Sequence, residues 1–245
     1  MDTEVLLLAA LFFAAAALYA SVGHAGASAY LAAMAIVGLS ADVMRPTALV
    51  LNLFVATIVV VRFSRAGHLP WRDLVTLAAG SIPAAYLGGT VDLPGDVYRP
   101  LVALALLAGA WRLATAPTDG DPATHGVPVV PGFLAGAGIG LLAGLTGTGG
   151  GIFLTPLLVL AAWTGTRDAA GLSGAFILVN SLAGLAGLWS GGFGLPPGLP
   201  LWVGAVVVGG IIGSWAGASR FSILSLRRAL ALVLVIAAAK LVFLP

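Results

Sequence analysis

The chain has 245 residues, of which 60% are hydrophobic and only 8% are charged, with a formal net charge of +2 and no cysteine. Soluble domains carry roughly 25% charged residues, so this composition excludes a water-exposed globular surface. It also excludes disulfides and thiol chemistry. The apolar residues come in long runs rather than in alternation, which excludes a membrane β-barrel and predicts an all-α polytopic membrane protein.

Charges, prolines and glycines divide the chain into ten apolar segments. Five precede a polar linker, at 4–22, 27–39, 46–62, 74–91 and 97–113. Five follow it, at 128–146, 151–164, 169–189, 199–218 and 223–243. At about 1.5 Å per residue the segments 27–39 and 151–164 are short for a crossing, so they either span or enter and return. Asp2 and Glu4 stand where a signal peptide would be basic, so we expect the first segment to be a permanent helix.

The two halves of the chain match one another around the linker at 114–128. The sequence VGHAG at 22–26 aligns with TGTGG at 146–150, and Asn52 then falls on Asn180. Both fourth segments carry a small residue at every fourth position, which is a pattern for close helix packing in lipid. The aligned residues are Ser81, Ala85 and Gly89 in the first half and Gly209, Gly213 and Gly217 in the second. We therefore predict two homologous repeats, 1–113 and 129–245.

Loop charges predict that the two repeats are inverted. The loop after the third segment carries three arginines, whereas its counterpart after the eighth carries no charge. The loop after the fourth segment is acidic, whereas its counterpart after the ninth is basic. The basic groups are Arg62, Arg65 and Arg72 in the first half, and Arg220, Arg227 and Arg228 in the second. Because Lys and Arg mark the cytoplasmic side, equivalent loops lie on opposite sides. If all ten segments span, both termini lie outside.

The stretch GLTGTGGGIFLTP at 144–156 interrupts an otherwise apolar run, although each glycine weakens a helix by about 1 kcal/mol relative to alanine. We name residues 147–151 the second glycine break, and their repeat partners 23–27 the first glycine break. Paired breaks in inverted halves indicate a central binding site. The amides and positive dipole ends of the short helices that follow would suit an anion. The alternative is that the glycines only permit a tight turn.

Polar residues within the apolar segments extend this candidate site. Asn52 and Asn180 could donate their amides to an oxyanion or tie down the broken helices. His24 could bind an anion, carry a proton, or stay neutral and hydrogen-bonded. Ser173 and Ser181 are further candidate donors, while Arg45 and Arg167 are interpreted as loop anchors paired with Asp42 and Asp168. The predicted substrate-binding set is Gly23, His24, Gly26, Ala27, Ser28, Asn52, Gly147, Thr148, Gly149, Gly150, Gly151 and Asn180.

No acidic residue lies deep in a segment, and the sequence offers no nucleotide motif, metal-ligand cluster or nucleophile–base pair. We therefore predict no catalytic residue, no metal and no cofactor, and a protein that is not an enzyme. Nucleic acid is excluded as a partner because no basic patch is present. The expected partners are a small anion, the lipid bilayer, protons as a candidate coupling ion, and a second copy of the chain.

The sequence GLTGTGGGIFLTPLLVL, with the weaker copy SVGHAGASAYLAAMAIV, resembles the TauE/SafE family of sulfite exporters. The motif G-x-G-G-G followed by a proline is complete in the second half, where it ends at Pro156. In the first half Ala25 and Ala27 replace glycines and Ala32 replaces the proline. The resemblance implies a multi-pass transporter of the prokaryotic inner membrane, acting on sulfite, sulfoacetate or a related organosulfonate. The alternatives are a passive anion channel and a non-transporting membrane subunit of an assembly.

Overall fold

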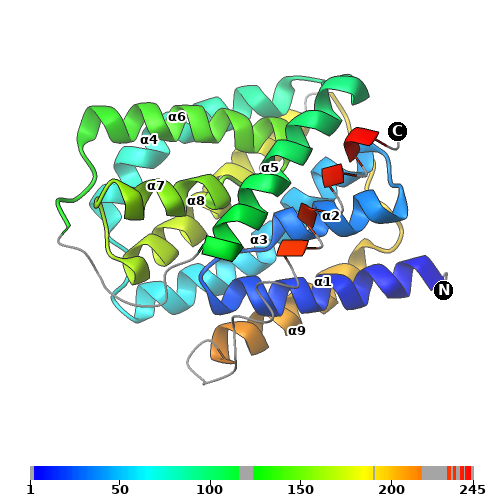
Figure 1. Ribbon diagram of the computed structural model, residues 1–245, viewed down its shortest axis with the longest axis horizontal. Coiled ribbons are helices and arrows are strands. Elements are labelled where there is room, and N and C mark those ends of the chain that lie inside the picture. Colours follow the sequence, from blue (N-terminus) through cyan, green and yellow to red (C-terminus); the bar gives the residue numbers. More distant parts are fainter. Residues whose placement is uncertain are drawn as a thin grey trace.

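The computed structural model describes residues 3–115, 124–189 and 191–216, together with 231, 232, 234, 235, 238, 239 and 241–243. Figure 1 shows the arrangement of its helices. They are α1 (Thr3–Ser21), α2 (Ala27–Val37), α3 (Ala41–Arg65), α4 (Trp71–Thr90), α5 (Gly95–Thr115), α6 (Val129–Thr146), α7 (Gly151–Leu160), α8 (Thr166–Trp189) and α9 (Leu199–Ala216). The described positions from 231 onward are helical too. The predicted all-helical fold is confirmed, with no strand in the described ranges.

Several predictions fall on residues outside these ranges. They concern most of the linker at 114–128, most of the tenth segment, Gly217, and the arginines at 220, 227 and 228. The division into repeats 1–113 and 129–245, joined by a linker at 114–128, stays a prediction.

Four helices are long and apolar enough to cross a membrane, namely α1, α3, α6 and α8. Many large apolar side chains lie on the outside of the bundle, such as Leu104, Leu160 and Trp215 at 64%, 86% and 76% exposure. A soluble protein rarely exposes so much contiguous apolar surface. The chain is therefore a polytopic membrane protein whose outer surface contacts lipid.

Four helices begin two or more residues earlier than the sequence predicts. Helix α3 begins at Ala41 rather than at residue 46, α4 at Trp71 rather than at 74, α5 at Gly95 rather than at 97, and α8 at Thr166 rather than at 169. In each case the additional residues include a charged side chain, which the sequence analysis assigns to a loop. Proline is best tolerated in the first turn of a helix, whereas Pro46 is the sixth residue of α3 and, lacking an N–H, donates no hydrogen bond to the Asp42 carbonyl. The first two turns of α3 include Asp42, Arg45 and Pro46.

Glycine contacts join α4 to α6 and α1 to α9, and Figure 1 shows each pair side by side. A Cβ added to α6 at Gly136, Gly140 or Gly144 would clash with the backbone of α4. A Cβ added to α9 at Gly209 or Gly213 would clash with the backbone of α1. The predicted role of the small-residue rows in helix packing is therefore correct, because van der Waals contact between backbones holds such helices together in lipid.

The helix packing has the symmetry of an inverted repeat. The first helix of each half packs along the fourth helix of the other half, with both pairs running parallel. The third helices, α3 and α8, cross antiparallel in the centre of the bundle. Their contacts place Val59 beside Gly174, Asn52 beside Ser181, and Leu49 beside Gly184. The repeat partners Asn52 and Asn180 thus lie near the middle of this crossing.

Candidate functional site

The first glycine break joins α1 to α2 through left-handed backbone. Gly23 has φ +84° and Gly26 has φ +101°, a conformation that costs other residues about 1–2 kcal/mol. The first helical hydrogen bonds of α2 come from the amides of Ala29 and Tyr30, which donate to the Gly26 carbonyl at 3.0 and 3.1 Å. Within the described ranges, the four amides of residues 25–28 donate to no backbone carbonyl.

The second glycine break repeats this geometry between α6 and α7. Gly147, Gly149 and Gly150 have φ values of +82°, +73° and +84°. The amides of Phe153 and Leu154 both donate to the Gly150 carbonyl at 3.1 Å. Among the residues the structure describes, the amides of residues 149–152 donate to no backbone carbonyl. Left-handed turns thus explain three of the clustered glycines, and the close approach of Ile177 explains Gly151.

Both breaks lie against the crossing of α3 and α8. A Cβ added at Gly149 would lie 2.8 Å from Asn52 Nδ2 and 3.3 Å from Ser181 Oγ. Gly23 packs on Ala170 of α8, where a Cβ would clash. The structure therefore brings each break to the central helix pair, as the inverted repeat requires.

A chain of side chains connects the first break to the helix that follows the second. His24 Nε2 lies 2.8 Å from Thr155 Oγ1 in α7, and Thr155 Oγ1 lies 2.6 Å from Ser173 Oγ in α8. His24 Nδ1 lies 3.2 Å from the Val22 carbonyl. The three side chains are almost fully buried. The sequence analysis did not identify Thr155, because the residue with which it forms a hydrogen bond, His24, lies 131 residues away along the chain.

The two buried asparagines differ in their hydrogen bonds. Asn52 Nδ2 donates to Ser181 Oγ at 3.3 Å, while its Oδ1 has no partner among the residues that the structure describes. Asn180 is completely buried, and neither its Nδ2 nor its Oδ1 has a partner in the described part of the chain. An unsatisfied buried polar group costs about 1–3 kcal/mol. Asn180 is thus a buried donor and acceptor with unused hydrogen-bonding capacity.

Two other predicted site residues are engaged locally. Ser28 Oγ lies 2.6 Å from the Tyr19 hydroxyl, and Thr148 Oγ1 lies 2.9 Å from Thr146 Oγ1. Ala27 is the buried first residue of α2. These contacts explain the burial of Ser28 and Thr148 without a ligand.

The interpretation of Arg45 as a loop anchor paired with Asp42 is wrong. Arg45 lies inside α3, 5% exposed, and donates to three backbone carbonyls. The acceptors are Gly144 at 2.8 Å from Nε, Val91 at 2.9 Å from Nη1, and Gly88 from Nη2. Arg45 therefore joins the C-terminal ends of α4 and α6. Asp168, expected to pair with Arg167, instead contacts His68 Nδ1 at 2.9 Å.

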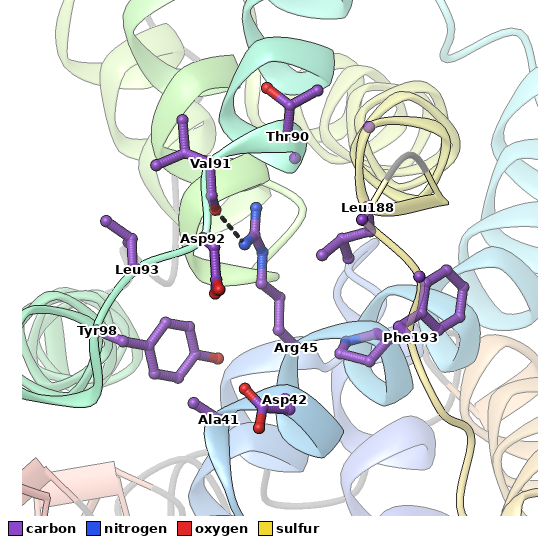
Figure 2. A pocket seen from close by; sticks show the side chains of 15 residues that line it. Ala41, Asp42, Arg45, Thr90, Val91, Asp92, Leu93, Tyr98, Leu188 and Phe193 are labelled. Atoms are coloured by element: carbon purple, nitrogen blue, oxygen red, sulfur yellow. Dashed lines mark hydrogen bonds between the residues drawn. The ribbon is translucent and has the colours of Figure 1, made fainter.

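A cavity of about 290 Å³ opens beside Arg45 (Figure 2). It lies among the start of α3, the ends of α4 and α8, and the first turn of α5. Its walls include Asp42, Arg45, Asp92, Tyr98, Leu188 and Phe193. None of the predicted substrate-binding residues lines it, so this cavity and the glycine breaks are neighbouring but separate features. Arg45 connects them, because Gly147 packs against it.

Apolar helices arranged as two inverted sets, with broken helices and buried polar groups at their crossing, define a polytopic membrane protein with the architecture of a transporter. Residues 7–241 match the sulfite exporter TauE/SafE family, and the chain belongs to that family. It is 38% identical over 247 residues to the probable membrane transporter protein y4hK of Sinorhizobium fredii (strain NBRC 101917 / NGR234), covering 99% of this chain and 100% of that protein. No solved structure matches the chain. Family and relative both indicate a membrane transporter rather than an enzyme.

Proposed function

We propose that this protein is a secondary transporter that exports a small sulfur-containing anion, such as sulfite, sulfoacetate or another organosulfonate, across the inner membrane of a prokaryote. Membership of the TauE/SafE family supports the solute class. The observation that carries the proposal is the pair of glycine breaks, whose eight amides without backbone acceptors in the described residues lie against the crossing of α3 and α8.

In this proposal the anion binds near the bilayer midplane between the breaks. The amides around the two breaks that have no backbone acceptor in the described chain, those of residues 25–28 and 149–152, donate to its oxygens, as amides at helix N-termini do for phosphate and carboxylate. Asn52 and Asn180 contribute from the central helix pair. The unsatisfied amide of Asn180 gains the partner that it lacks in the described part of the chain. Alternating access follows from rocking of the α1–α9 and α4–α6 pairs, each of which joins one helix from either half, about the α3–α8 crossing.

Transport in proteoliposomes tests this function. Purified protein should move sulfoacetate or sulfite across the membrane, and an imposed proton gradient should change the rate if protons are the coupling ion. Folded protein that moves no sulfur oxyanion would reject the solute class. Flux that follows only the electrochemical gradient of the anion itself and is coupled to no other gradient, with single-channel currents, would favour the passive channel.

His24 is the candidate proton carrier. Its Nε2 faces the Thr155 hydroxyl, which can either donate to a neutral imidazole or accept from a protonated one. The site can therefore satisfy both protonation states by rotating one hydroxyl. We expect His24→Gln to flatten the dependence of the transport rate on pH while retaining flux. An unchanged pH profile would remove His24 from the coupling mechanism.

A further inference from the structure

The cavity beside Arg45 has a buried positive charge in its wall. Arg45 is 5% exposed, and three of its five N–H groups donate to carbonyls of residues 88, 91 and 144. In the described chain no carboxylate forms an ion pair with it. A buried charge is costly without compensation, and the carbonyl ends of α4 and α6 supply only the partial negative charge of helix termini. The guanidinium therefore keeps net positive charge beside the cavity, among the lining side chains drawn in Figure 2.

The two carboxylates that line this cavity, Asp42 and Asp92, are exposed to water, whereas Arg45 and Tyr98 are buried. Charges in contact with water are weakened by the high dielectric and by salt, while a buried charge is weakened much less. The buried guanidinium therefore attracts anions more strongly than the exposed carboxylates repel them.

Arg45 also lies next to the second glycine break. A Cβ added at Gly147 would lie 3.1 Å from the Arg45 carbonyl oxygen and 3.2 Å from its Cγ. The Tyr98 hydroxyl donates to the Thr146 carbonyl at 3.2 Å, immediately before the break. Two side chains of the cavity thus hold the end of α6 from which the second break begins.

The position of the cavity along α3 gives its side of the membrane. Arg45 lies near the start of this helix, whereas Arg62 and Arg65 lie in its last turn. Clustered arginines mark the cytoplasmic end. The cavity therefore lies toward the outer side, and its 290 Å³ is at the small end of ligand pockets, which suits a small solute.

We propose that this cavity is an outer access site, in which a small organosulfonate or sulfur oxyanion binds to Arg45 after leaving, or before reaching, the glycine breaks. This inference rests on the proposed transport function and adds a second binding position to it. The remaining N–H groups of Arg45 donate to the anion. The positive charge makes this site selective for anions, which backbone amides alone achieve only through partial charges.

Single cysteines can test the site because the chain has none of its own. Leu188→Cys places a thiol on the cavity wall, and Leu195→Cys places one in the exposed loop that follows, outside the cavity. Each variant is treated with an anionic and a cationic methanethiosulfonate, carrying sulfonatoethyl or trimethylammonioethyl groups. A focused positive field raises the local concentration of anions by about tenfold or more. We expect the anionic-to-cationic rate ratio to be about tenfold higher at residue 188 than at residue 195.

Sulfoacetate provides the ligand arm of the test, because sulfite would itself cleave the mixed disulfide. It should slow modification of Leu188→Cys and leave Leu195→Cys unaffected. Adding Arg45→Gln to Leu188→Cys should lower the rate ratio to that of Leu195→Cys, and adding Asp92→Asn should raise it. If Arg45→Gln fails to fold, the effect of Asp92→Asn on the rate ratio and the protection by sulfoacetate still test the site.

Equal rate ratios at the two cysteines, or absence of protection by sulfoacetate, would overturn the access site. If sulfoacetate is transported in proteoliposomes but does not protect Leu188→Cys from modification, the access site is rejected and the transport function is retained. Protection without any flux of a sulfur anion would instead reject the transport function while retaining an anion-binding cavity.

Discussion

Gly23 and Gly38 share a left-handed backbone but differ in their surroundings. Gly38 has φ +91° and no atom within 4 Å of an added Cβ, whereas a Cβ at Gly23 would clash with Ala170 of α8. We expect Gly38→Ala to lower the free energy of unfolding by about 1–2 kcal/mol, the cost of the left-handed conformation alone. Gly23→Ala should cost clearly more, because α8 must move as well. Thermal unfolding of the two purified variants compares these costs, and equal losses would show that the α8 contact is easily relaxed.

Because the side-chain amide of Asn180 has unused hydrogen-bonding capacity, we expect its removal to impair transport without lowering stability. Asn180→Leu removes an unsatisfied buried amide, so stability should hold or rise by about 1–3 kcal/mol. Transport should be lost if the amide binds the solute. Asn52→Leu is the matched variant in the other repeat and should be the less stable of the two, because it removes the hydrogen bond to Ser181. Full transport by Asn180→Leu would exclude this side chain from the site.

Single residues also show where sequence reasoning stops. The glycine breaks were predictable, because glycine clusters in an apolar run indicate a required backbone geometry. The buried arginine was not, because a charge directly before Pro46 resembles a helix boundary. Its acceptors lie 43 to 99 residues away along the chain. The link between His24 and Thr155 likewise depends on tertiary contact between the halves.

At the scale of elements, two nearby glycines of α6 differ because one packs against α4 and the other does not. A Cβ at Gly140 would clash with the backbone of Ser81 in α4, while nothing lies within 4 Å of a Cβ at Gly138. Gly138→Ala should therefore stabilise the protein by about 0.5–1 kcal/mol, the usual gain within a helix. Gly140→Ala should destabilise it, because α4 and α6 must separate. Midpoints of thermal unfolding in the same detergent test the pair, and a stable Gly140→Ala would mean that the helices slide past one another at little cost.

Hydropathy predicted where most of the helices lie in the sequence. It predicted only in part which helices pack against one another. Nine of the ten expected segments correspond to helices among the described residues, including the short α2 and α7 of 11 and 10 residues. The early starts of α3, α4, α5 and α8 were missed because charged first turns resemble loops. The packing of α1 on α9 and of α4 on α6 had no signal beyond the small-residue spacing, which names a contact face but not its partner.

At the scale of the whole molecule, the inverted packing predicts the sidedness of each loop. Ala66 lies in the α3–α4 loop beside arginines, and Leu195 lies in the uncharged α8–α9 loop. We expect an impermeant maleimide to label Leu195→Cys in intact cells and Ala66→Cys only in inverted membrane vesicles. The same sidedness at both positions would contradict the antiparallel crossing of α3 and α8, and the outer placement of the cavity with it.

The pairing of α1 with α9 has a consequence for biosynthesis. Helix α1 is synthesised before α2 to α8, whereas α9, whose glycines fit against the α1 backbone, is synthesised after them. Those seven helices must therefore be made before α1 acquires this neighbour. A nascent chain that stops short of Leu199 leaves α1 without the helix against which its backbone packs, so α1 reaches its final packing only after α9 has been made.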